Sequence, residues 1–243
     1  LDFADLISKS TDILNKTNFK TKFKRIIVDE YQDISRGRYR LLKALIKKQK
    51  DCRIMCVGDD WQSIYRFSGS DISFVTNFKN KFFSKNSSIK FIGETHRFPE
   101  EISNVASRFI QRNPEQLPKI VKTTRTGGKI SFCEIENYKI QSIKRVVDQI
   151  ERGQGEKKVF ILWRVWNDVK EIQEDLEDLA KSRPDLHFEH GSIHKAKGLE
   201  WDIVILIGMD GGMFGFPRLI PEDSLKTMLL PKEENYPNAE ERR

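Results

Sequence analysis

The sequence lacks the features of a membrane or secreted protein. Its longest apolar run, IVILIGM at residues 203–209, is far shorter than the ~20 residues that cross a bilayer. The N-terminal stretch LDFADLISKS contains neither a basic region nor the apolar core of a secretion signal. It also lacks an initiating Met, so we expect the chain to be a segment of a longer protein, with no membrane partner.

Cysteine and histidine are scarce, with three and four residues respectively. Cys52 and Cys56 flank a strand-like run, Cys133 stands alone, and no His or Cys pair completes a zinc site. Three unpaired thiols are typical of a reducing compartment and predict a cytoplasmic location. The phosphate-cradling motif G-x-x-x-x-G-K-[S/T] is also missing, because GGKI at residues 127–130 has the wrong spacing.

Charge, by contrast, is plentiful. Of the 243 residues 33% are charged, and the formal net charge is +7 with a pI near 9.2. This charge permits a polyanion such as nucleic acid as a partner without requiring one, because Lys-rich surfaces are common. The hydrophobic content of 38% fits a globular protein with one large domain or two of ordinary size.

Apolar spacing predicts that strands alternate with helices. Such an alternation indicates an α/β fold with parallel sheets and helices on both faces. A stretch rich in Pro, Thr and Gly, residues 112–129, is the clearest break in composition. The predicted strands are residues 25–30, 53–60, 88–94, 129–136, 158–164 and 202–208, and the predicted helices are about 3–14, 37–49, 99–112, 141–151 and 169–181.

Two carboxylates end the first predicted strand, in IIVDEYQD. In a parallel sheet the ligand site lies beyond the carboxyl ends of the strands, where Asp29 and Glu30 are expected. Asp29 can hold Mg²⁺, a hard cation that prefers oxygen ligands and nucleotide phosphates. Glu30 could orient or deprotonate an attacking water. The alternative for this motif alone is a strand end that is acidic without any function.

The segment VGDDWQSIYRFSGS, residues 57–70, repeats this arrangement after the second strand. Gln62 could contact both a phosphate oxygen and a neighbouring side chain, and so sense the γ-phosphate. Tyr65, Arg66 and Phe67 combine aromatic and cationic side chains, as stacking on single-stranded bases requires. Ordinary core packing is the alternative for Phe67.

Arg97, in THRFPEEI, follows a predicted strand and precedes a predicted helix. There it could clamp a phosphate or pair with a nearby acid, and the motif alone favours the ion pair.

The segment GSIHKAKGLEWD carries His194 and Lys197 in a predicted turn before Gly198. Cations next to a glycine let the backbone approach a phosphate chain closely. Glu200 could accept a ribose hydroxyl. The alternative is a basic surface turn with a structural glycine.

Together these motifs resemble, in order and phrasing, those of the UvrD/Rep-like superfamily 1A DNA helicases, and GDDWQSIYRFSG is most similar to the helicase IV branch. The resemblance implies a RecA-like (P-loop NTPase) fold whose two lobes bind ATP and Mg²⁺. It also implies a 3′→5′ helicase or translocase that acts in DNA repair or recombination. The implied partners are single-stranded DNA or DNA junctions, with proteins of the repair or transcription machinery as further candidates, and a monomer is expected. The motifs that carry the resemblance are VDEYQD, VGDDWQSIYRFSGS, THRF, HKAKGLEWDIVILIGMDGGMF and AEERR.

The resemblance also implies roles for single residues. Asp29 matches the Mg²⁺-binding acid of motif II, and Glu30 matches its catalytic base. Gln62 corresponds to the motif III glutamine that senses the γ-phosphate and couples it to DNA. Phe67 takes the place of the aromatic that stacks on a base, and Arg97 that of the motif IV arginine finger.

The remaining correspondences lie near the nucleotide and in motif V. His96 stands where the family usually has a Tyr near the adenine, so the nucleobase preference is open. His194 and Lys197 fall in motif V, which is associated with DNA contact, and Glu200 matches its ribose-contacting acid. Gly198 is expected on the nucleotide side of the same motif.

The resemblance assigns residues 1–88 to the C-terminal part of the first lobe, with motifs II and III. It assigns residues 89–243 to the second lobe, with motifs IV and V, the start of motif VI and no large inserted domain. The phosphate loop would precede Leu1 and the last motif VI arginine would follow Arg243, so this segment alone is expected to be inactive. Two alternatives stay open: a helicase-like ATPase that binds and recycles RNA polymerase, and an inactive DNA-binding helicase scaffold.

Overall fold

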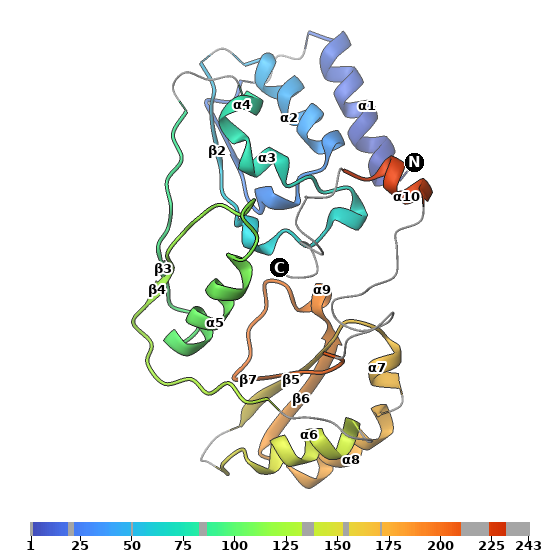
Figure 1. The fold of residues 1–243 in the computed structure, drawn as a ribbon. Helices are drawn as coiled ribbons and strands as arrows, with labels where there is room; N and C mark the ends of the chain where they lie inside the picture. Colours follow the sequence, from blue (N-terminus) through green and yellow to red (C-terminus); the bar gives the residue numbers. More distant parts are fainter. Residues whose placement is uncertain are drawn as a thin grey trace. The chain divides into compact units, whose positions relative to one another are not determined.

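The structure is a computed structural model that describes residues 2–18, 22–49, 51–82, 87–132, 139–152, 156–170, 172–209 and 224–231 (Figure 1). The chain divides into two compact units. Unit 1 comprises residues 1–93, 106–121 and 222–243, and unit 2 comprises residues 94–105 and 122–221. Unit 1 thus includes residues 89–93, 106–121 and 222–243, which the sequence analysis assigned to the second lobe, and the assignment of RecA-like lobes stays a prediction.

Each strand pair among the described residues is parallel, and the sheets are small, which confirms the predicted α/β class with parallel sheets flanked by helices. No helix in the described ranges has the length and apolar content needed to cross a bilayer. The strands are β1 Arg25–Val28, β2 Arg53–Cys56, β3 Glu94–Thr95, β4 Lys122–Thr123, β5 Lys157–Trp163, β6 Leu186–Ser192 and β7 Ile203–Leu206. The helices are α1 Phe3–Lys16, α2 Arg36–Lys47, α3 Ser73–Thr76, α4 Phe78–Phe82, α5 Glu100–Ile110, α6 Lys139–Asp148, α7 Asn167–Lys170, α8 Gln173–Ser182, α9 Ile193–Ala196 and α10 Ser224–Leu229, with 3₁₀ turns η1 Tyr31–Asp33, η2 Asp60–Gln62 and η3 Arg66–Ser68.

In unit 1, β1 and β2 form a parallel pair with α2, α3 and α4 beside it (Figure 1). Alternate strand residues face these helices, as the two-residue period of a strand dictates. They pack against a core of Tyr31, Ile34, Leu42 and Phe74, and the strand residues in contact with it are Ile26, Val28, Ile54 and Cys56.

The opposite face of this strand pair is open in the described part of the chain. Ile27 and Met55, which lie opposite each other in the register, are 69% and 60% exposed. The prediction of helices on both faces is therefore wrong for this pair as described. Apolar composition alone does not show which residues of a short strand are covered.

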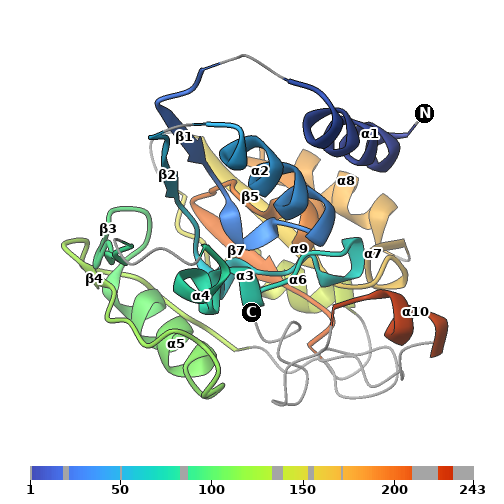
Figure 2. The same cartoon turned by 90° about the horizontal axis from the view of Figure 1, so that it is seen from above.

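Helix α1 packs beside α2 in both views (Figure 1, Figure 2). Its N-cap Asp2 accepts a hydrogen bond from the Asp5 N–H at 2.7 Å, which satisfies one of the free donors of the first turn. Leu14 is buried, whereas Phe3 and Ile13, which share the predicted apolar spacing, are exposed.

Unit 2 is built on a three-stranded parallel sheet in the order β6-β5-β7. Helices α6 and α8 cover one face of it, and its core residues are Ile140, Ile143, Val147, Val159, Ile161, Val169, Ile172, Leu176, Leu179, Leu186, Ile205 and Ile207. On the other face Val204 and Leu206 of β7 stay partly exposed, so the expectation that both faces of this strand are covered is also wrong. Strand β6 was not predicted, because His187 and Glu189 interrupt its apolar residues.

Three further predicted elements differ from the structure. Of the strand predicted at residues 88–94, only Glu94 lies in a strand, in the two-residue β3 that pairs with β4. Residues 129–132 form no strand, and residues 133–136 of the same predicted strand lie outside the described residues. The helix predicted at 169–181 is divided into α7 and α8.

Arg183 joins α6 to the sheet of unit 2. Its side chain is buried and donates to two carbonyls at the end of α6, to Val147 O at 2.7 Å and to Ile150 O at 3.2 Å. It also forms a two-point contact with the Asp185 carboxylate, from Nε and Nη2 at 2.8 and 2.7 Å. Val147 O also accepts from the Ile150 N–H at 3.0 Å, so the guanidinium is a second donor there, and it supplies charged hydrogen bonds to the Asp185 carboxylate.

We expect Arg183→Ala to destabilise the protein by about 2 kcal/mol, because Ile150 O and the Asp185 carboxylate lose this charged donor and the buried side chain loses its packing. The hydrogen bond from Arg183 lowers the pKa of Asp185 to about 2. A carboxyl with a lowered folded-state pKa stabilises the fold above its unfolded pKa, and this contribution is lost as the pH falls from about 4 to 2. Urea unfolding of the two proteins should therefore show a stability difference that shrinks over this pH range.

The matched control is Lys170→Ala, which truncates an exposed cation on α7. It should cost little stability at any pH. An equal loss in the two variants would contradict the role given to Arg183.

Candidate functional site

The carboxyl ends of β1 and β2 stay together beyond the last residue of each strand. The Val57 N–H donates to Val28 O at 2.8 Å, and the Tyr31 N–H donates to Val57 O at 2.8 Å. These bonds bring Glu30 and Asp59 to one edge of the strand pair. Both acidic segments therefore lie beyond the carboxyl ends of a parallel strand pair, and the roles predicted for their residues stay predictions.

Glu30 has a left-handed backbone conformation, with φ 48° and ψ 42°. Its N–H donates to Asp29 Oδ1 at 2.9 Å, and both carboxylates are exposed. The left-handed region costs a residue with a side chain roughly 1–2 kcal/mol, and such conformations are concentrated at functional sites. The turn sends the chain from β1 into η1 and leaves the Glu30 side chain at the strand edge.

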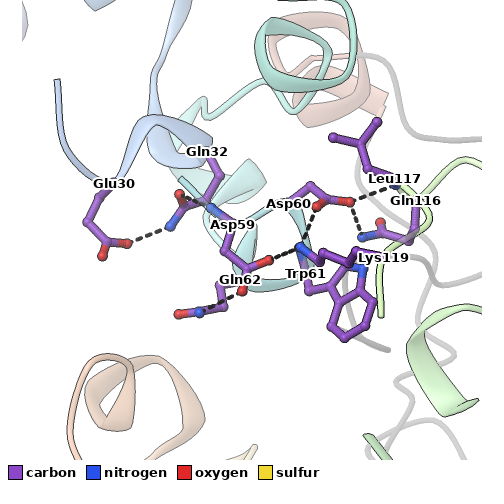
Figure 3. A network of polar contacts seen from close by, with 9 residues as sticks. All are labelled: Glu30, Gln32, Asp59, Asp60, Trp61, Gln62, Gln116, Leu117 and Lys119. Carbon is purple, nitrogen blue, oxygen red and sulfur yellow. Dashed lines mark hydrogen bonds and ion pairs between the residues drawn. The ribbon is translucent and has the colours of Figure 1, made fainter. Parts of the chain in front are cut away.

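Gln32 connects the two strand ends (Figure 3). Its side chain is buried, with 1% exposed, and its Nε2 donates to Glu30 Oε2 at 2.5 Å. Its Oε1 accepts from the Asp59 N–H at 2.9 Å. A backbone N–H can only donate, so the amide must direct its oxygen to Asp59 and its nitrogen to Glu30. The sequence analysis missed Gln32, although an amide two residues after an acid was the available signal.

Gly58 leaves the room that this contact needs. A Cβ at this position would lie 2.7 Å from Gln32 Oε1 and 3.1 Å from the backbone nitrogens of Gln32 and Tyr31. These distances are shorter than or at the limit of normal packing. Glycine is therefore required at residue 58 for close approach.

Asp59 is the next member of the network in Figure 3. Its Oδ2 accepts from Gln62 Nε2 at 2.9 Å, and its Oδ1 accepts from the Trp61 N–H at 3.0 Å. Lys119 Nζ also contacts Oδ1. The predicted sensor glutamine is thus held by a carboxylate that Lys119 also contacts, while Gln32 accepts from the backbone N–H of the same residue.

Asp60 is buried, with 2% exposed, and is fully supplied with donors. It accepts from Lys119 Nζ at 2.8 Å, from Gln116 Nε2 at 2.9 Å and from the Leu117 N–H at 2.9 Å. A buried carboxylate is stable only when it is paired and hydrogen-bonded in this way. The sequence analysis missed Lys119, because it lies 59 residues from Asp60 and no local pattern joins them.

The predicted DNA-contacting residues follow directly along the chain. Phe67 is 58% exposed and meets the edge of the Tyr65 ring with centroids 5.9 Å apart, so the core-packing alternative for Phe67 is wrong. Burial raises the pKa of the Tyr65 phenol, and the nearby carboxylates of Asp33 and Glu30 raise it further. Arg66 Nε donates to Pro231 O at 2.9 Å.

A second group of predicted residues lies in unit 2. Arg97 Nε is 3.3 Å from Glu200 Oε2 in an exposed ion pair, as the motif alone favoured. Arg125 Nη1 donates to Arg97 O at 2.7 Å and to His96 O at 3.3 Å, which holds the turn between β3 and α5. The sequence analysis missed this role of Arg125. His96 Nε2 lies 3.9 Å from a Glu94 carboxylate oxygen.

The predicted turn at residues 193–197 is instead the short helix α9, whose N-cap Ser192 accepts from the Lys195 N–H at 3.2 Å. His194 lies within this helix and Lys197 directly follows it. Gly198 has φ 82°, and a Cβ there would meet nothing within 4 Å. The glycine serves the backbone conformation, which residues with a side chain rarely adopt.

The described residues hold no group of three or more His, Cys, Asp or Glu side chains that could bind a metal alone. Mg²⁺ is commonly held by one or two carboxylates together with substrate phosphates and water. The exposed Asp29 beside Glu30 fits that kind of site. A metal here would depend on a bound nucleotide for the rest of its ligands.

Comparison with known proteins shows which family of sequences this chain resembles. Residues 1–83 match the UvrD/REP helicase N-terminal domain. The whole chain aligns with DNA helicase IV of Escherichia coli, with 36% identity over 244 residues. The ATP-dependent DNA helicases PcrA of Staphylococcus epidermidis and Staphylococcus aureus are each 31% identical over 173 residues, or 68% of the chain. The chain spans 34% of the length of helicase IV and 23% of each PcrA.

We expect Gly58→Ala to destabilise the protein by about 1–3 kcal/mol, the usual cost of forcing an extra methyl group into a packed position. The added Cβ would displace Gln32 or push the two strand ends apart. The matched control is Gly37→Ala in α2, whose Cβ would meet Ile7 Cγ2 at an ordinary 3.6 Å. Alanine in a helix is favoured over glycine, so this control should be neutral or stabilising. Similar urea midpoints for the two variants would contradict the close approach at residue 58.

Proposed function

Because this chain is homologous to UvrD-family DNA helicases, we propose that it is part of an ATP-dependent DNA helicase or translocase. The enzyme would couple ATP hydrolysis to 3′→5′ movement on single-stranded DNA in repair or recombination. One observation carries the proposal: Glu30 and Gln62 are linked through Gln32 and Asp59 at the end of a parallel strand pair. A base and an amide joined in this way can respond together to a nucleotide phosphate.

In this mechanism Glu30 accepts a proton from the water that attacks the γ-phosphate. Its carboxylate is exposed at the strand edge and oriented by the donor from Gln32, so it can reach a water and keep one direction. Gln62 is exposed, and its Nε2 donates to Asp59 Oδ2 at 2.9 Å. It would contact the phosphate while Asp59 fixes its direction.

ATP and Mg²⁺ are the proposed cofactors. Asp29 would hold the cation, which when bound neutralises phosphate charge during the transfer. Within the 243 residues no phosphate loop accompanies Asp29. We therefore propose that this chain contributes the acid, base and sensor of the site, with the loop supplied by another part of the complete protein.

The DNA contact is proposed to lie at Tyr65, Arg66 and Phe67. The exposed Phe67 ring can stack on a base, which is a sequence-tolerant contact. Tyr65 touches Phe67 and lies in the field of the Glu30 carboxylate. Tyr65 is therefore near both the ring proposed to stack on a nucleobase and the carboxylate proposed to act in hydrolysis, and could couple the two.

In unit 2, Arg97 is proposed as an arginine finger, with Glu200, Gly198 and His96 on the nucleotide side and His194 and Lys197 on the DNA side. Arg125 would keep the Arg97 turn in place through its bonds to two carbonyls. The intact acids and amides of unit 1 argue against the inactive scaffold. A cytoplasmic monomer remains the expectation for the complete protein.

We expect Glu30→Gln in the complete protein to reduce ATP turnover by about 10²–10⁴ or more, because an amide cannot accept the proton. Nucleotide affinity should be unchanged, since glutamine keeps the size of the side chain and an oxygen for Gln32. Steady-state ATPase with single-stranded DNA, together with binding of a non-hydrolysable analogue, would separate the two effects.

The control is Asp12→Asn, the same change of chemistry on the exposed face of α1. Its turnover should equal that of the unmodified protein. Residues 1–243 alone should hydrolyse no ATP, and hydrolysis at the rate of the complete protein would refute the shared-site proposal. An unchanged rate in Glu30→Gln would remove Glu30 from the mechanism.

We expect Phe67→Ala to weaken binding of a single-stranded oligonucleotide by about 1–3 kcal/mol, roughly 5- to 150-fold, because one stacked base loses its partner. Fluorescence anisotropy with a labelled oligothymidylate measures this directly. Phe3→Ala removes another exposed phenylalanine, on α1, and should leave the affinity unchanged. Equal affinities of both variants would exclude Phe67 from the DNA contact.

A further inference from the structure

The contacts of Glu30, Gln32, Asp59, Gln62 and Lys119 form a continuous chain, here called the polar relay (Figure 3). Glu30 and Gln62 already have proposed roles at the nucleotide. Gln32 and Lys119 have none, and neither side chain is at the exposed edge. Their contacts indicate what they do there.

Both the oxygen and the nitrogen of the Gln32 amide have a hydrogen-bond partner. The amide oxygen is fixed by the Asp59 N–H at 2.9 Å, and the nitrogen therefore faces Glu30 at 2.5 Å. Its burial leaves the side chain no room to turn away. The Glu30 side chain is exposed, so a contact with a buried, fixed amide is what selects one of its directions.

Lys119 lies between the two adjacent acids Asp59 and Asp60. Two neighbouring carboxylates repel each other, and a shared ammonium group removes that repulsion. The ammonium group also lies 4.5 Å from the centre of the Trp61 ring, which adds a cation–π contact to its placement. Asp60 keeps Gln116 and Leu117 as donors without Lys119, but Asp59 would lose the cation that opposes its movement.

We propose that Gln32 and Lys119 are positioning residues for hydrolysis: Gln32 directs Glu30, and Lys119 fixes Asp59 so that Asp59 directs Gln62. The inference rests on the proposed ATPase function. It gives segment 113–119, which no motif includes, a part in setting the sensor glutamine. Asp59 then helps to orient both groups: its N–H donates to Gln32, which directs the base, and its carboxylate accepts from the sensor Gln62.

The test uses Lys119→Met in the complete protein, with ATP and a single-stranded oligonucleotide. The variant keeps the length of the side chain and removes its charge. We expect kcat to fall about 10- to 100-fold, the effect of a small misplacement of a catalytic group, while KM for ATP changes less than about threefold. Lys119→Arg should recover part of kcat. The matched control Lys122→Met, an exposed lysine three residues away, should be unchanged.

A double-variant cycle shows whether Lys119 acts through Gln62. In a Gln62→Ala background, Lys119→Met should have little further effect on kcat, because the group that it positions is gone. Independent, multiplicative losses would overturn the inference. Gln32→Leu should likewise lower kcat at constant nucleotide affinity, and an unchanged kcat would overturn the part given to Gln32.

A purely structural role for Lys119 predicts a lower unfolding temperature with normal kcat in the molecules that remain folded, which also overturns the inference. If Lys119→Met does not fold, Asp59→Asn tests the same contact from the other side and should give the same loss of kcat. Failure of the two proposals is distinguishable. Absence of DNA-stimulated hydrolysis in the unmodified protein refutes the proposed function, and with it the inference. Normal hydrolysis in Lys119→Met refutes the inference alone.

Discussion

The candidate site depends on two main-chain hydrogen bonds, from Val57 N–H to Val28 O and from Tyr31 N–H to Val57 O. They extend the pairing of β1 and β2 into the loops and bring two acidic segments to one edge. Because the backbones come so close, residue 58 has no space for a side chain. The side chains of the polar relay can reach one another because the backbone holds the two strand ends together. The positions of the charged groups at this edge are therefore set by main-chain hydrogen bonds.

The acids at this edge are stable because each has its own donors. Glu30 accepts a hydrogen bond from Gln32, and Asp59 accepts from Gln62 and from the Trp61 N–H. The buried Asp60 accepts from the loop that follows α5. Lys119 bridges the last two. A buried carboxylate without such donors would cost several kcal/mol. The same contacts that make the acids tolerable also fix their directions, so stability and orientation have one physical cause here.

Much of the fold and of the candidate site could be predicted from the sequence where the residues that determine them are close together in the chain. The runs IIVDE and RIMCVGDD are apolar, end in acids and form the strands β1 and β2, and the motif residues beside them lie at the expected edge. Strand β6 was missed because His187 and Glu189 obscure its alternation, and residues 88–93 contain Ile89, Phe91 and Ile92 without forming a strand. A strand needs a neighbour to pair with, and composition does not reveal whether one is available. The Asp60–Lys119 contact joins residues 59 apart, so only the fold could show it.

The left-handed backbone of Glu30 creates a conflict at this residue between the best backbone conformation and the side chain that the site requires. For the turn alone glycine would be the best choice, because it adopts this conformation without steric cost. For the proposed hydrolysis the residue must carry a carboxylate. The protein therefore keeps, in its candidate site, a residue that weakens the local fold, and selection for thermal stability alone would favour the loss of the proposed base.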